Sequence, residues 1–142
     1  MQKYSFNYNK ESMAKALGSS LPISTKHSAE ICKLIRGMSL TKAKELLVKA
    51  ISKQKAIPFN RFNMDLGHRA GMGPGRYPVK ASKEILNILE SVESNALSND
   101  MNKEKLIIAH INAQKASSPW HFGRQRRRKM KRTHIEVIVK EK

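Results

Sequence analysis

The residues with the clearest chemical meaning lie between positions 114 and 134. This segment carries eight lysines and arginines and two histidines, and it contains no aspartate or glutamate. Guanidinium and ammonium groups donate charge-assisted hydrogen bonds to phosphate oxygens, and arginine can donate two in parallel. Like charges at this density repel one another and destabilise a folded protein unless something neutralises them. The segment therefore predicts an external polyanion as its partner, and a nucleic-acid backbone is the commonest source of such charge.

Aromatic side chains stand inside the same segment, at Trp120, His121 and Phe122, and Gly123 follows them. Such rings stack on unpaired bases, and a glycine allows a positive φ or a close backbone approach at the tip. The alternative is a charge run that only keeps the chain soluble, which we consider less consistent with its position between two predicted strands. We expect contacts with the phosphates of this partner from Lys115, Arg124, Arg126, Arg127, Arg128, Lys129, Lys131 and Arg132.

A second basic stretch covers residues 55–77. It holds four of the seven glycines together with Pro58 and Pro74, so it predicts a long irregular loop. Asp65 is its only carboxylate, and Phe59, Phe62 and Tyr77 are interleaved with the basic residues. The Gly-x-Gly-x-Gly run at 71–75 lacks the preceding strand, the spacing and the lysine of nucleotide-binding loops. We interpret the loop as a further nucleic-acid contact, with plain flexibility as the alternative. Its candidates are Arg61, His68, Arg69 and Arg76.

The other residues that could do chemistry show no catalytic or metal-binding pattern. The five histidines are scattered, and none pairs with a cysteine or a carboxylate at metal-ligand spacing. Cys32 is the only cysteine and lies among apolar residues of a predicted helix, so we expect it in the core. No Ser-His-Asp set and no pair of carboxylates suited to acid–base work is apparent. We therefore expect no catalysis, no metal and no cofactor.

Composition supports a single domain that binds an anionic partner. The 142 residues include 28 lysines and arginines against 11 aspartates and glutamates, which gives a net charge of +17. This charge points to nucleic acid or to an anionic membrane. No apolar run approaches the roughly 20 residues of a membrane-spanning helix, and Met1 opens a polar stretch rather than a signal peptide. The sequence thus predicts a cytosolic protein without membrane contact.

Hydrophobic periodicity predicts an α+β fold in which three helices pack on a small antiparallel sheet. Helices are predicted over residues 25–36, 41–54 and 79–97. Strands are predicted over residues 14–21, 106–113 and 134–140. In the last strand, the apolar residues Ile135, Val137 and Val139 occupy every second position, as in a strand that is buried on one face. The acidic residues of the third helix and the turn after it are expected to form a face that RNA avoids: Glu84, Glu90, Glu93, Asp100 and Glu104.

The predicted strands on either side of the basic segment indicate a long projecting hairpin. We divide the single domain into a body (1–113 and 134–142), an irregular basic loop (55–77) and the projecting hairpin (114–133). Ten extended residues on each side would place the tip about 30 Å from the body. Because such an arm has no core, we expect it to be poorly ordered until a partner surrounds it.

Specific short motifs are distributed over nearly the whole chain. The motifs before the loop are Lys15-Ala-Leu-Gly18, Leu21-Pro-Ile-Ser24, Glu30-Ile-Cys32 and Ile35-Arg-Gly-Met38. Those in and after the loop are Pro58-Phe-Asn-Arg-Phe62, Gly67-His-Arg69, Gly75-Arg-Tyr-Pro-Val-Lys80, Glu93-Ser-Asn-Ala96 and Thr133-His-Ile-Glu-Val137. Together they resemble a known family, the universal large-subunit ribosomal protein numbered twenty-two, in its archaeal branch. Bacterial members carry a Pro-Arg-Ala-x-Gly-Arg-Ala-like signature at the tip of their hairpin, and only Pro119, Gly123 and Arg124 match it here.

The resemblance implies a structural, non-catalytic protein that binds large-subunit rRNA, assists its assembly and lines the nascent-peptide exit tunnel with its hairpin. It implies rRNA, neighbouring large-subunit proteins and the nascent peptide as partners, and the cytoplasmic ribosome as location. The tip residues expected at the tunnel are Pro119, Trp120, His121, Phe122, Gly123 and Arg124. Weaker candidates for rRNA contact on the body are Lys26, His27 and Arg36. The alternatives are a free cytosolic regulator that binds RNA or acidic proteins, and an RNA-modifying enzyme.

Overall fold

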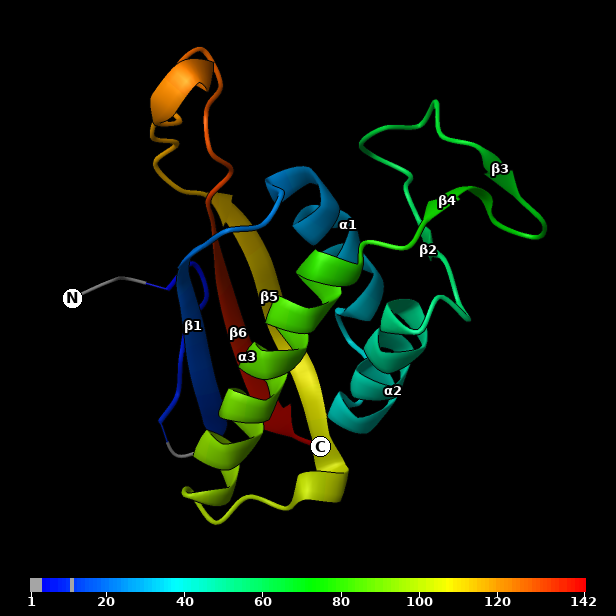
Figure 1. Cartoon of the computed structure of the whole chain (residues 1–142). Helices are drawn as coiled ribbons and strands as arrows, with labels where there is room; N and C mark the ends of the chain where they lie inside the picture. Colours follow the sequence, from blue (N-terminus) through cyan, green and yellow to red (C-terminus); the bar gives the residue numbers. More distant parts are fainter. Residues whose placement is uncertain (1–3, 11) are drawn as a thin grey trace.

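Three antiparallel strands form the main sheet of this protein, in the order β1-β6-β5 (Figure 1). They are β1 (Met13–Leu21), β5 (Leu106–Lys115) and β6 (Thr133–Glu141). The helices are α1 (Thr25–Ile35), α2 (Leu40–Ile51) and α3 (Val79–Leu97). The computed structural model describes residues 4–10 and 12–142, so residues 1–3 and 11 of the predicted body lie outside it. The predicted α+β class is confirmed, and the predicted elements agree with the structure to within three residues at each end.

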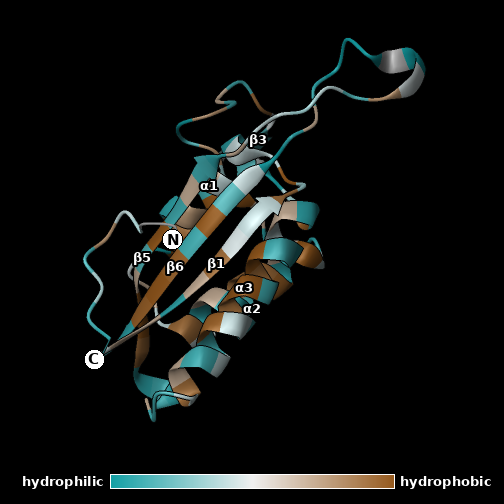
Figure 2. Ribbon diagram, turned by 90° about the vertical axis from the view of Figure 1, so that its left-hand side faces the viewer, coloured by the Kyte–Doolittle hydropathy of each residue, from teal (hydrophilic) through white to brown (hydrophobic). Residues whose placement is uncertain are grey.

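Helices cover one face of this sheet because each has a single apolar stripe. α3 packs on β1 and β6, α1 packs on β5, and α2 packs against α3 (Figure 2). The apolar stripe of α3 is buried throughout: Ala81, Ile85, Ile88, Leu89, Val92 and Ala96. Cys32 is 2% exposed within this core, which confirms its predicted place.

Gly18 of β1 lies against a side chain of α3. A Cβ atom built on Gly18 would lie 2.5 Å from Cδ1 of Ile88 and 2.8 Å from Cδ1 of Leu21. These distances are well below van der Waals contact, so a side chain here would require the ends of the Ile88 and Leu21 side chains to move. The small side chains Ala14 and Ala16 on the same strand are buried as well.

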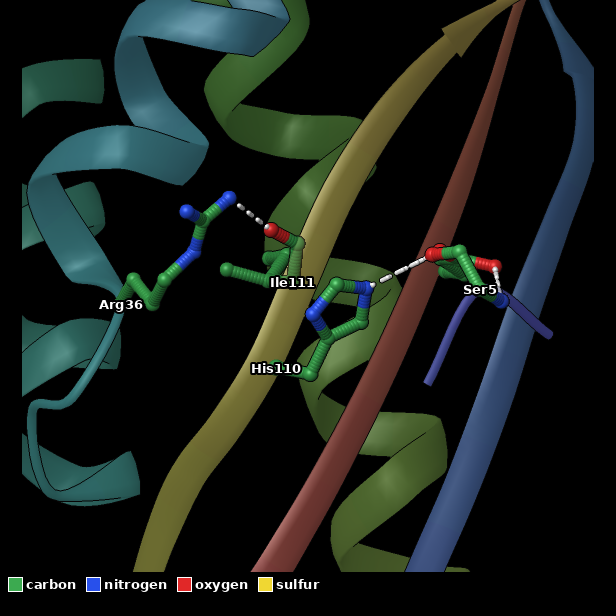
Figure 3. Close-up of polar contacts among 5 residues, drawn as sticks. Ser5, Arg36, His110 and Ile111 are labelled. Atoms are coloured by element: carbon green, nitrogen blue, oxygen red, sulfur yellow. Dashed lines mark hydrogen bonds and ion pairs between the residues drawn. The ribbon is translucent and has the colours of Figure 1, made fainter. Parts of the chain in front are cut away.

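The prediction that β6 is buried on one face only is wrong. On its second face Glu136 is 3% exposed and Ile138 is fully buried. The segment formed by residues 4–8 covers this face, where the Ser5 amide and hydroxyl donate hydrogen bonds to the Glu136 carboxylate. His110 of β5 lies 3.0 Å from both the Ser5 hydroxyl (Figure 3) and the Glu136 carboxylate. The His110 ring also stacks on Phe6. Tyr4, Phe6 and Tyr8 alternate with polar residues, but this short pattern does not indicate that the segment packs on β6.

Replacement of Glu136 by glutamine should reduce the stability of the protein at neutral pH. It should also make the loss of stability at low pH smaller. Burial opposes ionisation of Glu136, but the hydrogen bonds from Ser5 and His110 outweigh it and hold the carboxyl pKa below its usual range. A carboxylate with a depressed pKa stabilises the fold above its unfolded pKa of about 4.3, and this contribution is lost as the pH falls through the folded pKa. Thermal unfolding between pH 7 and pH 3 should therefore show a shallower loss of Tm for Glu136→Gln. Glu141→Gln, an exposed change on the same strand, should leave the profile unaltered, and matching profiles for both variants would contradict this account.

Residues 55–77 are predicted to be irregular, but the structure shows that they contain a second small sheet. Its strands are β2 (Ile57–Pro58), β3 (His68–Arg69) and β4 (Gly73–Arg76), in the order β2-β4-β3. Two- to four-residue strands that contain glycine and proline show no alternation that sequence could reveal. Ile57 and Phe59 are fully buried, and Ile57 belongs to the main hydrophobic core, so β2 attaches this subdomain to the body.

The hairpin continues beyond the main sheet as two paired but irregular segments (Figure 1). The β5–β6 ladder ends at the pair Lys115 and Thr133, slightly beyond the predicted strand ends. Further out, hydrogen bonds run from the Met130 amide to the Pro119 carbonyl (2.8 Å) and from the His121 amide to the Arg128 carbonyl (2.7 Å). A short 3-10 turn, Gly123–Gln125, closes the tip. The estimate of about 30 Å assumed fully extended strands, which this irregular arm does not form.

Within residues 4–10 and 12–142, none of the helices combines the length and hydropathy needed to cross a membrane.

Candidate nucleic-acid interface

A groove of about 970 Å³ lies where three distant parts of the chain meet. The start of α1 forms one wall, the loop forms a second, and the base of the projecting hairpin forms the third. We call it the basic groove. Its uncharged lining includes Ser24, Thr25, Phe62, Asn63, Ala116, Ser118 and Met130, and its cations are Lys26, Arg76, Lys115, Lys129, Lys131 and Arg132.

The basic groove is electrostatically one-sided. Six lysine and arginine side chains line it, and among the described residues none of its lining side chains is a carboxylate. α1 begins at this wall after the N-cap Ser24, and its first turn has no acidic residue. The first amides of a helix lack intrahelical acceptors and lie at the positive end of its dipole. The groove thus offers anions both side-chain charge and backbone donors, which is the chemistry of phosphate binding.

His27 lines the basic groove as a neutral ring. Its imidazole packs edge-on against Phe59, with 5.3 Å between the ring centroids. Burial, followed by the charges of Lys131 and Arg76, holds the pKa of His27 below its usual range. At neutral pH this residue therefore presents a hydrogen-bonding ring to a ligand and not a fixed positive charge.

Four of the contacts predicted on the body and the loop lie outside the basic groove. Arg36 lies at the end of α1, where its guanidinium donates a 2.8 Å hydrogen bond to the Ile111 carbonyl of β5 (Figure 3). Arg61 shares a smaller hollow of about 210 Å³ with it. His68 and Arg69 are exposed on β3, in the outer part of the loop subdomain. The sequence identifies all four residues as basic, but it does not indicate which part of the protein surface each side chain occupies.

The tip of the hairpin exposes its aromatic rings. Trp120 is 60% exposed and Phe122 is 77% exposed. The Lys129 ammonium lies 4.4 Å from the centroid of the Trp120 ring, and His121 stacks on Phe122. Gly123 has a φ of +72°, as predicted for a tip glycine. The remaining predicted contacts of the arm are exposed around this turn: Arg124, Arg126, Arg127 and Arg128.

Glu30 positions the loop, and it is not among the site residues predicted from the sequence. Its carboxylate is buried and accepts three backbone hydrogen bonds, from Asn60 (3.2 Å), Arg61 (2.9 Å) and Phe62 (2.7 Å). These bonds fix the segment that carries Phe62 and Asn63 against α1, so they shape one wall of the basic groove. The available signal was a single carboxylate at a core-facing position of an apolar helix, between Ala29 and Ile31.

The acidic side of the protein is partly neutralised by its own lysines. Glu93 of α3 forms ion pairs with Lys44 of α2 and with Lys103, the latter at 3.1 Å. Burial opposes ionisation of Glu93, but the hydrogen bonds from Lys44 and Lys103 outweigh it and lower the pKa of the carboxyl. Glu93 therefore adds less negative charge to the face that RNA is expected to avoid, whereas Glu90 is exposed.

The described residues hold no group of three or more histidines, cysteines or carboxylates that could bind a metal ion. Burial raises the pKa of the Cys32 thiol to about 12. A thiol that is both buried and protonated is a poor nucleophile.

Comparison with known proteins gives a consistent result. The family model of ribosomal protein L22p/L17e matches residues 16–140. A large ribosomal subunit protein uL22 from Methanosphaera stadtmanae is 42% identical over 139 residues, which cover 92% of this chain and 90% of the relative. The uL22 protein of Methanocaldococcus jannaschii is 42% identical over 147 residues, which cover 98% of this chain and 94% of the relative. That of Nanoarchaeum equitans is 41% identical over 144 residues, covering 96% and 83%.

Proposed function

The chain belongs to the ribosomal protein L22p/L17e family, and from this premise we propose that it binds large-subunit rRNA through the basic groove and the projecting hairpin. As a family member it is a structural constituent of the large ribosomal subunit, in the cytoplasm, and the family is not one of enzymes. Its partners are rRNA and neighbouring ribosomal proteins. In this proposal it assists the folding of rRNA during subunit assembly.

The observation that carries the proposal is the convergence of cations from three segments on one groove. Lys26 comes from α1, Arg76 from β4 and Lys131 from the hairpin base. Charges brought together in this way repel one another in the free protein, and an RNA backbone would remove that repulsion and release counterions. The phosphate contacts proposed for the groove are those of Lys26, Arg76, Lys115, Lys129, Lys131 and Arg132.

We further propose that the chain is one domain with the three parts defined above, and that the hairpin tip lines the nascent-peptide exit tunnel. The exposed rings of Trp120 and Phe122 and the exposed arginines around Gly123 support this role, because they can contact both rRNA and a passing peptide. The alternative of a free cytosolic regulator would use the same basic surface. Membership of a ribosomal family over nearly the full chain favours the ribosome.

The affinity for a transcript of large-subunit rRNA should fall steeply with salt. Each phosphate neutralised contributes about 0.7 to 0.9 to the slope of log affinity against log salt. The six lysines and arginines of the basic groove alone should give a slope of about −4 to −5. Filter binding or fluorescence anisotropy over a range of potassium chloride concentrations measures this slope. A slope near zero would contradict phosphate contact as the basis of binding.

A further inference from the structure

A second hollow, of about 420 Å³, adjoins the basic groove between the starts of α1 and α3. We call it the Tyr77 pocket. Its walls include Pro22, Tyr77 and Pro78, and its polar side chains include Ser24, His27, Lys80 and Lys131. Among the described residues, none of the side chains that line it is a carboxylate. Its volume lies within the range of about 300–1,000 Å³ that is typical of small-ligand sites.

The lining of the Tyr77 pocket combines two chemistries. Apolar carbon dominates the surface of its walls, whereas Lys80 and Lys131 supply positive charge. The first turns of α1 and α3 lack acidic residues, so the positive ends of both helix dipoles remain uncompensated here. A bare phosphate would leave the apolar walls exposed to water, and an apolar peptide would leave the cations unpaired. A nucleotide satisfies both, since it joins a flat base to an anionic phosphate.

The Tyr77 pocket and the basic groove form one continuous surface. Ser24, His27 and Lys131 line both hollows. An RNA strand whose phosphates follow the groove can therefore place an adjoining base in the pocket. A paired base cannot enter without leaving its helix, so the base must be unpaired.

We propose that the Tyr77 pocket binds one unpaired nucleotide of the RNA, with its base against Tyr77 and the two prolines and its phosphate at Lys80 and Lys131. The inference rests on the proposed function, because it requires RNA in the basic groove.

Tyr77 is held in place for this role. The Arg69 guanidinium carbon lies 5.3 Å from the centroid of its ring, and the Tyr77 carbonyl accepts a 2.9 Å hydrogen bond from the Val79 amide. This assigns a positioning role to Arg69, which lies on β3 outside the basic groove. A ring already fixed in its bound orientation loses little conformational entropy when a base stacks on it.

Tyr77→Ala should lower the affinity of the full chain for a large-subunit rRNA transcript by about 5- to 150-fold, the range of base–aromatic stacking. The slope of log affinity against log salt should not change, because no charge is removed. Tyr77→Phe keeps the ring and should bind like the unaltered chain. On a fully paired RNA duplex of equal length, Tyr77→Ala and the unaltered chain should bind equally.

Equal binding of the transcript by Tyr77→Ala and the unaltered chain would overturn the inference, and so would an equal loss on the transcript and on the duplex. Either result leaves the proposed function intact as long as the salt slope remains steep, whereas a slope near zero contradicts the proposed function itself. If Tyr77→Ala fails to fold, ultraviolet crosslinking of the unaltered chain to the transcript gives the answer. A nucleotide adduct on Tyr77 supports the pocket, and adducts confined to the hairpin contradict it.

Discussion

A variant with four cations of the hairpin base replaced by glutamine should bind large-subunit rRNA about a thousand- to ten-thousandfold more weakly at about 50 mM salt. The four are Lys115, Lys129, Lys131 and Arg132, all of which line the basic groove. Each phosphate contact contributes about 0.7 to 0.9 to the salt slope, which at this salt concentration corresponds to roughly tenfold in affinity. The slope itself should become shallower by about three.

The matched control removes the same net charge from elsewhere on the surface. It replaces four exposed lysines in and after α2 that lie outside the groove: Lys42, Lys49, Lys53 and Lys55. Since these side chains have no place in the proposed interface, this variant should keep most of the affinity and most of the slope. If the control loses as much affinity as the groove variant, binding depends on total charge and the groove is not the interface. Circular dichroism and thermal unfolding establish that both variants are folded.

Glu30→Ala should lower the free energy of unfolding by about 3 kcal/mol, because it removes the acceptor of three backbone hydrogen bonds. The carboxylate is only 3% exposed, so water cannot readily replace it within the packed structure. The loop should then detach from α1 around Asn60 and Phe62, and affinity for rRNA should fall because one wall of the basic groove is lost. Glu30→Gln retains an acceptor oxygen and should lose about half as much stability.

Urea unfolding measures the stability change, and hydrogen exchange at the amides of residues 60–62 locates it. Glu45→Ala provides the control, since Glu45 is exposed on α2 and its loss should change the stability by less than about 0.5 kcal/mol. If Glu30→Ala is as stable as the unaltered chain and the amides of residues 60–62 remain protected, the buried carboxylate does not hold the loop.

Sequence periodicity predicted the elements that build the body. The stripe of α3 and the alternation of β6 are local patterns set by burial against one layer, so they can be recognised without the fold. The second buried face of β6 could not be predicted, because it depends on a contact between Ser5 and Glu136, which are far apart in the sequence. The strands β2, β3 and β4 could not be predicted either, because strands of two to four residues are too short to show an alternating pattern.

The candidate site was predicted in composition but not in geometry. Counting charges identified the hairpin and the loop as basic, and the resemblance pointed to their partner. Only the fold shows that Lys26, Arg76 and Lys131 line the same groove and that Arg36 is directed to the Ile111 carbonyl instead. The Tyr77 pocket likewise requires two helix starts that are separated by more than fifty residues in the sequence.

The most direct test of the central claim is a cryo-EM map of the large ribosomal subunit that contains this chain. The account predicts rRNA backbone along the basic groove, with phosphate oxygens within hydrogen-bonding distance of Lys131 and Arg132. A map in which the groove faces solvent or another protein, and the RNA contacts other surfaces of the chain, would contradict it.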